Sequence, residues 1–510
     1  MGGGRRRLIL LAVMGLAFAV RVAALDGQSL WRDEVDAIRF ASGPLVELLG
    51  LFAQPGQNGP LYYLLLRPWL GVAGQSALAL RFFSLFFGLL TVPLLYQVGR
   101  RLFPRWPQVA MLAALLAALS PYLVWYSQEG KMYSLVTCFI ILSMERYLAA
   151  LERGGWGRWL AYVVVTSASF YVHLLAALIV PVQIVVFVLV GRRDGYRRWK
   201  PWLASLAALT LPYLPLLAWQ VPLLLKPAVT GYRFVPLGDM LRSLLMSYSL
   251  GVLEQPRSWL LVPFVALLLG GGVLLVRRRE WRVSLGVLLC WLLLPVGALF
   301  LITLLRPMYT ARYLIFVLPA YLLLLALALV AVGRRSRIVA GALLVSLLLL
   351  NGWGLWVQAR TPLKADFRAA TAYVAQRLES GDLLIFQIPH GRYSFDYYFQ
   401  RLERPRRSLP PRVGGDGGYR SFLPLVTGSG RPGYRWAEGL YTNAGMTAGE
   451  VDRRMREISA GSRTVWLVAT EVPMWDAGNL VQGWLEEHGQ LQEDAHFVRV
   501  DVYRYELAGP

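Results

Sequence analysis

The chain has 510 residues, of which 56% are hydrophobic and 16% charged, and its mean hydropathy is +0.48. A soluble domain rarely carries so little charge, and this composition is typical of a polytopic membrane protein. The net charge of +22 comes from short basic clusters between apolar runs, which indicates the positive-inside pattern and argues against a nucleic-acid-binding face.

Eleven apolar runs predict membrane-spanning helices. The first, 8–25, follows Arg5-Arg6-Arg7. Because it is long for the apolar core of a signal peptide and further spans follow, we favour an uncleaved helix over a cleaved signal peptide. Each of the others is close to the ~20 residues that a helix needs to cross a bilayer. They lie at 78–99, 108–126, 132–150, 159–175, 176–190, 201–220, 258–276, 283–304, 313–332 and 338–357.

The breaks between the runs alternate in charge. Together with the N-terminal arginines, basic clusters occupy every second break, at 100–105, 153–158, 192–200, 277–282 and 334–337. With eleven spans they all fall on one side of the membrane, which is therefore predicted to be cytoplasmic. The other breaks then face outward. This alternation depends on Tyr171-Val172-His173 dividing 159–190 into two spans.

Two of the outward breaks are long, at 26–77 and 221–257. Each contains an amphipathic stretch, 40–52 and 237–250, which predicts a helix lying in the membrane interface. Together we expect these two loops to roof a cavity at the membrane surface.

The composition changes near residue 360, where charge, Gly and Pro increase and spanning runs end. Periodicity predicts helices at 366–378 and 480–488, strands at 382–386, 464–470 and 497–505, and a mobile loop at 401–418. The sequence thus predicts a polytopic α-helical membrane domain, 1–359, followed by an extracytoplasmic α/β domain, 360–510.

The first outward break concentrates charge in Ser29-Leu30-Trp31-Arg32-Asp33-Glu34-Val35-Asp36. A carboxylate at Asp33 or Glu34 can accept the proton of an acceptor hydroxyl as that hydroxyl attacks. Acidic residues are also favoured at a helix N-terminus by the helix dipole alone. Position does not decide between these two interpretations.

Other polar residues gather at outward breaks. The stretch Asn58-Gly59-Pro60-Leu61-Tyr62-Tyr63 places two tyrosines where either headgroups or a sugar can meet them. The turn Ser127-Gln128-Glu129-Gly130-Lys131-Met132-Tyr133 carries a lysine that can hold a phosphate, or that simply extends to the interface. His173 fits a structural hydrogen-bonding group better than a base.

Arg306 and Arg312 lie on the outward side, where arginines are scarce. A guanidinium suits a pair of phosphate oxygens, so we favour Arg312 as an anion ligand over a lipid anchor. A general base together with a cationic clamp fits group transfer from a phosphate-linked donor. Since nucleotide sugars are cytoplasmic, a donor on the outward side would be lipid-borne.

These motifs resemble the GT-C membrane glycosyltransferases, and more narrowly the family-39-like enzymes related to protein O-mannosyltransferases and aminoarabinose transferases of lipid A. The resemblance rests on Trp31-Arg32-Asp33-Glu34, on Pro60 to Tyr63, on Ser120-Pro121 with Tyr126 to Ser134, and on Arg312-Tyr313. It covers roughly 1–360. The family often has His-Pro-Pro where Asn58-Gly59-Pro60 stands, and Arg where Lys131 stands.

The resemblance implies a polyprenyl-phosphate-linked sugar donor, an inverting transfer to an acceptor hydroxyl, and a site on the outer face of the cell's inner or plasma membrane. It implies Asp33 as the base, with Glu34 beside it. The donor phosphate would be held by Lys131, Arg312, Tyr133 and Tyr313. The substrates would be positioned by Asn58, Pro60, Tyr62, Tyr63, Gln128, Glu129 and His173.

No metal site is assigned, although some GT-C enzymes use a divalent cation and Asp33, Glu34 and Asp36 offer oxygens. Cys138 and Cys290 lie in apolar runs and predict neither a disulfide nor a metal site.

Two other functions remain open at this point. A transporter or flippase of lipid-linked glycans would spread charges along the depth of its spans, whereas here the polar groups gather at one face. A binding module on a passive anchor would need only one or two spans.

Overall fold

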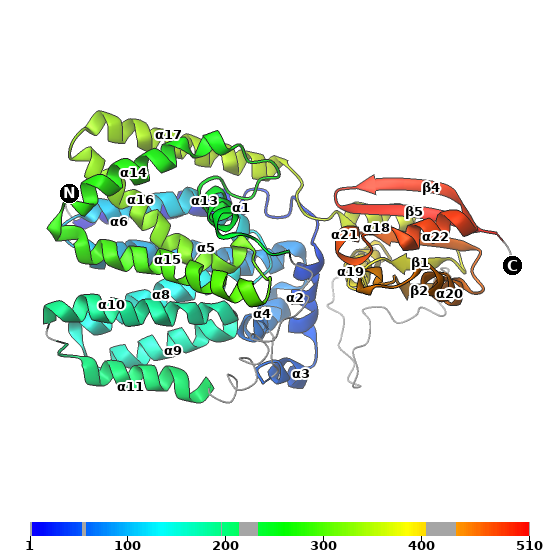
Figure 1. Cartoon of the computed structure of the whole chain (residues 1–510), viewed down its shortest axis with the longest axis horizontal. Coiled ribbons are helices and arrows are strands. Elements are labelled where there is room, and N and C mark those ends of the chain that lie inside the picture. The colour runs from blue at the N-terminus through cyan, green and yellow to red at the C-terminus, as the bar shows by residue number, and fades with distance from the viewer. Residues whose placement is uncertain (1–2, 54–57, 195, 214–232, 404–434, 509–510) are drawn as a thin grey trace. The chain divides into compact units, whose positions relative to one another are not determined.

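The computed structural model describes residues 3–53, 58–194, 196–213, 233–403 and 435–508. The chain forms two compact units (Figure 1). The helical unit comprises Met1–Leu25, Pro44–Ala73 and Leu78–Thr361, and the sheet unit comprises Asp26–Gly43, Gly74–Ala77 and Pro362–Pro510. Two pieces of the first loop predicted to face outward, 26–43 and 74–77, therefore belong with the C-terminal residues.

The helical unit consists of α-helices and short 3₁₀ helices, labelled η. Its long helices, among them α10, α15 and α17, run nearly along one direction in Figure 1. In chain order the elements are α1 (Gly3–Val22), α3 (Leu45–Gly50), α4 (Pro60–Ala73), α5 (Ala77–Leu102), α6 (Pro107–Leu119), α7 (Pro121–Ser127), α8 (Tyr133–Arg153), α9 (Trp156–Val172), η1 (Leu174–Leu178), α10 (Ile179–Asp194), α11 (Trp199–Thr210), η2 (Leu211–Tyr213), α13 (Leu237–Leu250), η3 (Ser258–Leu261), α14 (Val262–Val276), η4 (Arg279–Trp281), α15 (Arg282–Leu305), η5 (Ala311–Val317), α16 (Leu318–Gly333) and α17 (Arg337–Arg360).

Each predicted apolar run coincides with helix, although the run 201–220 is described only as far as residue 213. Within the described ranges, seven helical segments are long and apolar enough to cross a membrane, and the pair α6–α7, bent by 56°, brings the number to eight. The multi-pass membrane architecture is confirmed. The number of eleven spans stays a prediction, because α1, α9 and α11 are not among these segments.

The bend between α6 and α7 is held by an arginine from α1. Pro121 has no N–H, so the carbonyl of Ala117 loses the donor that a continuous helix would supply. The guanidinium of Arg21, which is fully buried, donates to Ala117 O at 3.1 Å and to Ala118 O at 2.8 Å. A broken helix at membrane depth is tolerated when its backbone groups find such partners.

A second buried polar network joins α8, α9 and α10. The Gln183 side chain accepts from the Tyr162 hydroxyl at 2.8 Å and donates to Ser143 Oγ at 2.9 Å. Its backbone carbonyl accepts from the Tyr147 hydroxyl at 2.6 Å. Because unsatisfied polar groups are costly in a bilayer, this network fixes how the three helices pack.

The sheet unit has five strands in the order β2-β1-β3-β5-β4. β1 pairs in parallel with β2 and β3, while β3 with β5 and β5 with β4 are antiparallel. The elements are α2 (Arg32–Ser42), α18 (Phe367–Ala375), β1 (Leu383–Phe386), α19 (Gly391–Glu403), β2 (Arg435–Glu438), η6 (Thr442–Ala444), α20 (Ala448–Ser459), β3 (Thr464–Ala469), α21 (Val472–Trp475), α22 (Leu480–His488), β4 (Gly489–Phe497) and β5 (Val500–Leu507).

The core of the sheet unit lies between the central strands and the helices α20 and α22. It includes Ile385 of β1, Leu467 of β3, Met455 of α20 and Leu485 of α22, all at most 1% exposed. The predicted strands at 382–386 and 464–470, the helices at 366–378 and 480–488, and the α/β class are confirmed.

The strand predicted at 497–505 is confirmed as β5, with its start shifted to Val500 because a short turn with Arg499 at φ +56° follows the end of β4 at Phe497. Its hairpin partner β4 was not predicted. β4 is a largely exposed edge strand and therefore lacks an apolar pattern. The single helix expected at 40–52 is divided at Gly43-Pro44 into the end of α2 and the short α3.

The helix predicted at 237–250 is confirmed as α13, and its place in the membrane interface stays a prediction. Residues 221–232 of its loop lie outside the described residues. So does the loop predicted at 401–418, except for its first three residues, which end α19.

Candidate functional site

The acidic segment begins a helix within the sheet unit. α2 starts at Arg32, and the Glu34 carboxylate accepts from the backbone N–H of Trp31 at 3.5 Å. Before it, the Tyr398 hydroxyl accepts from the Leu30 N–H at 2.6 Å and contacts Ser29 Oγ at 3.2 Å. The start of α2 is therefore fixed against α19.

Asp33 and Glu34 have different environments although they are adjacent. Glu34 is fully buried and faces the Lys364 ammonium at 3.0 Å. Asp33 is 20% exposed and lies 3.6 Å from the Arg32 guanidinium, which also pairs with Glu471 at 3.3 Å. Of the two, the Asp33 carboxylate is the more accessible to a proton from a substrate.

The carboxylates of α2 are paired with different cations. Glu34 faces Lys364, Asp33 faces Arg32, and Asp36 pairs with Arg39 at 2.8 Å. Among the residues that the structure describes, His, Cys, Asp and Glu side chains do not form a group of three able to hold a metal ion.

In the helical unit, the predicted loop around Asn58 precedes a helix, α4, that the sequence analysis had left within the loop. Gly59 adopts φ +86°, which favours glycine, and a Cβ there would lie 2.9 Å from Met132 Cε. The Asn58 carboxamide accepts from the Leu174 N–H at 3.1 Å. Asn58 thus ties the start of α4 to the break between α9 and η1.

The residues after Pro60 bring α4 to the turn that carries Lys131. The Tyr63 hydroxyl lies 3.5 Å from Lys131 Nζ, and the Tyr62 hydroxyl lies 3.4 Å from Ser84 Oγ. Ser84 Oγ donates in turn to the Lys131 carbonyl at 3.2 Å. Lys131 is only 8% exposed, so its ammonium is buried beside Tyr63.

Gln128 and Glu129 occupy the other end of this turn. Gln128 donates to the carbonyls of Arg21 at 3.0 Å and Ala23 at 2.6 Å, where α1 ends. This position gives Gln128 a role in holding the turn. Glu129 is 3% exposed.

Arg312 lies in η5, which packs on α8. Its guanidinium carbon is 5.9 Å from the ring centre of Tyr133 and 6.0 Å from that of Tyr313. The His173 ring lies 6.2 Å from Tyr133 and 5.6 Å from Tyr313. Arg312, Tyr313, Tyr133 and His173 therefore form one group from η5, α8 and the end of α9.

These contacts form two groups, one of Lys131 with Tyr63 and one of Arg312 with Tyr133, His173 and Tyr313. Lys131 and Tyr133 are two residues apart in the chain, and we call the six residues together the cation–tyrosine cluster. Asp33 and Glu34 belong to the sheet unit. The roles assigned to all these residues stay predictions.

Three residues that support these groups were not selected from the sequence. In the sequence, Arg21 lies near the end of an apolar run and Ser84 lies within a predicted span. Lys364 is one of many cations that follow the last span. For Arg21 and Lys364, the only signal in the sequence is a basic residue close to an apolar run. Basic residues are also common at the ends of ordinary membrane spans, so this signal does not identify a supporting contact.

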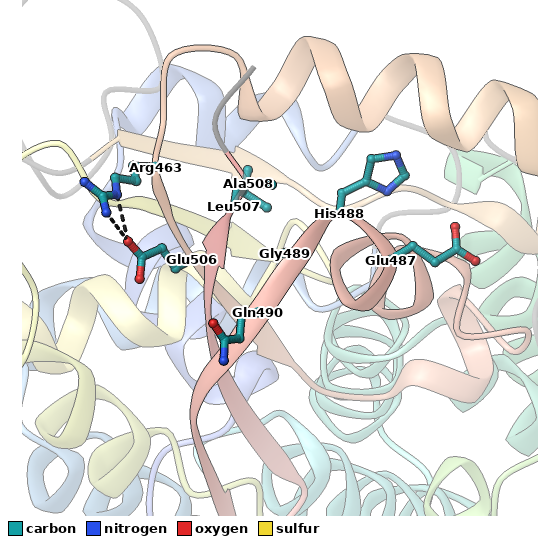
Figure 2. Close-up of a pocket in the computed structure, with 8 residues that line it drawn as sticks. All are labelled: Arg463, Glu487, His488, Gly489, Gln490, Glu506, Leu507 and Ala508. Carbon is teal, nitrogen blue, oxygen red and sulfur yellow. Dashed lines mark hydrogen bonds and ion pairs between the residues drawn. The ribbon is translucent and has the colours of Figure 1, made fainter.

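A pocket elsewhere in the sheet unit has a different character (Figure 2). Its cation, Arg463, already faces Glu506 at 2.6 Å, and none of the predicted site residues lines it. The lining residues are Arg463, Glu487, His488, Gly489, Gln490, Glu506, Leu507 and Ala508.

Comparison with solved structures reveals the fold. ArnT from Cupriavidus metallidurans in the apo state matches with a TM-score of 0.60 at 13% identity, over 97% of this chain and 97% of that chain. The same protein bound to undecaprenyl phosphate matches with a TM-score of 0.56 at 13% identity, over 99% and 98%. The chain has the GT-C fold.

Further matches agree with this GT-C fold. The oligosaccharyltransferase of Archaeoglobus fulgidus, tethered to an acceptor peptide, matches with a TM-score of 0.53 at 11% identity, over 98% of this chain and 74% of that one. A family model described as dolichyl-phosphate-mannose-protein mannosyltransferase matches residues 55–219. A search of curated protein sequences finds no match. The GT-C fold expected from the motifs is confirmed, and the family model matches within the part of the chain that carries the resemblance.

Proposed function

We propose that this GT-C protein transfers a sugar from a polyprenyl-phosphate-linked donor to an acceptor hydroxyl on the extracytoplasmic face of the cell membrane, with inversion. The observation that carries the proposal is the cation–tyrosine cluster. It places Lys131 and Arg312, both held by aromatic neighbours, in a fold shared with a protein solved with undecaprenyl phosphate.

The proposed reaction is a single displacement. The acceptor oxygen forms a bond to the anomeric carbon as the bond from that carbon to the phosphate oxygen breaks. The proton of the acceptor hydroxyl passes to the Asp33 carboxylate, and polyprenyl phosphate leaves with the bonding electron pair. Lys131 and Arg312 stabilise the negative charge that develops on the departing phosphate, which is where a preorganised cation lowers the barrier most.

The environments on α2 support Asp33 as the base. A general base must exchange its proton with the substrate, and Asp33 is partly exposed, whereas Glu34 is fully buried against Lys364. We assign Glu34 the role of holding α2 in place. Asn58, Pro60, Tyr62, Tyr63, Gln128 and Glu129 are assigned to shaping the donor side of the site.

The sidedness in this proposal comes from charge. Arginine clusters follow every second apolar run, and the site residues lie at the alternate breaks. A cysteine placed at Asn58 should therefore react with an impermeant thiol reagent in intact cells, and one placed at Gly155 should not. Labelling of Gly155 alone would contradict the proposal.

The central test compares Asp33→Asn with Asp26→Asn, a control at an exposed carboxylate that pairs only with the surface residue Arg368 in the described contacts. We expect Asp33→Asn to lower transfer by at least about 100-fold, the lower end of what a general base contributes, while leaving donor binding unchanged. Asp26→Asn should keep full activity. Full transfer by Asp33→Asn would remove Asp33 from the mechanism.

A flippase with the same polar groups is distinguished by its need for two compartments. Purified protein in detergent, with a polyprenyl-phosphate-linked sugar and a hydroxyl acceptor, should form glycosylated product without a sealed vesicle. Movement of lipid-linked glycan across proteoliposomes with no product in detergent would favour the flippase instead.

A further inference from the structure

His173 ends one helix and begins the next. Its backbone N–H donates to the Ser169 carbonyl at 3.0 Å, and its own carbonyl accepts from the Ala176 N–H at 2.9 Å. The residue is extended, at φ −154°, and its side chain caps η1. Both backbone polar groups of His173 are thus used within the chain.

The side-chain contact determines where the imidazole carries its proton. Nδ1 accepts a hydrogen bond of 3.2 Å from the Leu175 N–H. A nitrogen that accepts must be unprotonated, so the neutral ring bears its hydrogen on Nε2. Because the two ring nitrogens point in strongly diverging directions, Nε2–H is directed away from the start of η1.

That Nε2–H donor is buried and is not used by any described residue. His173 is 2% exposed, and within the ranges that the structure describes Nε2 has no hydrogen-bond partner. Leaving a buried N–H unpaired costs about 1–3 kcal/mol. A histidine serving only as a cap would need Nδ1 alone, so the burial of Nε2–H calls for a ligand.

The neighbours of the ring identify the chemistry of that ligand. Tyr133 and Tyr313 flank the imidazole, and the Arg312 guanidinium lies against the same two tyrosine rings. Asn58 fixes the adjacent backbone by accepting from the Leu174 N–H. A rigid N–H donor beside a guanidinium is suited to an oxygen of an anion, because charge-assisted hydrogen bonds are the strongest.

We infer that His173 Nε2–H donates a hydrogen bond to the phosphate of the polyprenyl-phosphate donor, next to Arg312. This inference rests on the proposed function and deepens it, since it moves His173 from positioning the substrate to binding the donor phosphate. The imidazole acts as a neutral donor and takes no part in proton transfer.

Two substitutions separate the cap from the proposed ligand contact. His173→Asn keeps an oxygen near the position of Nδ1 that can accept from Leu175, but it loses the distal donor. His173→Gln places an amide N–H near the position of Nε2 and weakens the cap. The probes are undecaprenyl phosphate and its phosphate-free counterpart undecaprenol, with affinity measured on the detergent-solubilised full chain by intrinsic tryptophan fluorescence.

We expect His173→Asn to melt at the wild-type temperature without lipid and to bind undecaprenyl phosphate at least about tenfold more weakly, with undecaprenol binding unchanged. His173→Gln should bind undecaprenyl phosphate within about threefold of the wild type. Wild-type affinity of His173→Asn for undecaprenyl phosphate would overturn the inference. Equal weakening toward both lipids would also overturn it, since that result reports a structural role.

Arg312→Ala keeps the failure of this inference distinct from failure of the proposed function. If Arg312→Ala weakens binding of undecaprenyl phosphate and His173→Asn does not, only the role of His173 is lost. If the wild type does not prefer undecaprenyl phosphate over undecaprenol, the donor site itself is lost and both proposals fall.

Discussion

The side-chain amide of Gln128 donates a hydrogen bond of 3.0 Å to the backbone carbonyl of Arg21, and the Arg21 guanidinium donates at 3.2 Å to Ser127, the residue before Gln128. Each of the two chain segments therefore satisfies polar groups at the end of the other. The turn that carries Lys131 begins at this reciprocal contact, so its position depends on α1 as well as on α7.

Arg21→Leu should destabilise the helical unit. The substitution leaves the carbonyls of Ala117 and Ala118 without their donor at a helix break, and each buried unsatisfied group costs about 1–3 kcal/mol. We expect a clear decrease in the melting temperature of the protein in detergent. Arg5→Leu, at an exposed position of the same helix, is the matched control. Equal melting temperatures for the two variants would show that Arg21 does not hold the break.

Gly88→Ala should disturb the same turn from the side of α5. An added Cβ would lie 2.7 Å from Ser127 Cβ and even nearer to its hydroxyl, so Ser127 must move. Overpacking of this kind typically costs about 1–3 kcal/mol, and we expect weaker donor binding to accompany it. Gly297→Ala meets nothing within 4 Å and should be neutral. The check is melting temperature and undecaprenyl phosphate affinity for both variants.

The spans were predictable because an apolar run long enough to cross a bilayer has few other uses, and 313–332, for example, coincides with the continuous segment Ala311–Gly333 formed by η5 and α16. The supporting contacts were not. In the sequence, Arg21 cannot be distinguished from any arginine at a membrane boundary. Only the structure shows that Pro121 leaves a backbone carbonyl without its helical donor and that Arg21 donates to it. Lys364 lies 330 positions from Glu34, and neither composition nor local sequence pattern predicts a pair between residues so far apart. β4 escaped prediction because an exposed edge strand needs no apolar alternation.

Lys364→Met should loosen the start of α2. It removes the ammonium that the fully buried Glu34 faces at 3.0 Å, and breaking one side of a buried ion pair typically costs about 3–5 kcal/mol. We expect faster hydrogen–deuterium exchange in residues 32–42. The double variant Glu34→Leu with Lys364→Met should recover much of the protection, because two apolar groups replace the pair.

The control for this prediction is Arg368→Met, which breaks the exposed pair with Asp26 and should change exchange very little. If Lys364→Met leaves the exchange of α2 unchanged, Glu34 does not depend on Lys364, and the structural role that we assign to Glu34 is wrong.

The sheet unit should also lose a definite contribution to stability in acid. Burial raises the pKa of Glu493, but hydrogen bonds from Tyr373 at 2.9 Å and Arg504 at 2.9 Å outweigh it, and the pKa of this carboxyl is lowered overall. A group whose pKa is lower in the folded state stabilises the fold above its unfolded pKa, about 4.3, and loses that contribution as the pH falls through its folded pKa.

Glu493→Gln should therefore be less stable than the wild type at pH 7 by at most about 1 kcal/mol, since the pair is partly exposed. Melting curves from pH 7 to pH 3 should show this difference shrinking as the pH falls below about 4, whereas Glu457→Gln, which alters an exposed pair at 3.9 Å, should follow the wild type throughout. A difference between Glu493→Gln and the wild type that stays constant down to pH 3 would mean that the difference does not come from ionisation of the Glu493 carboxyl.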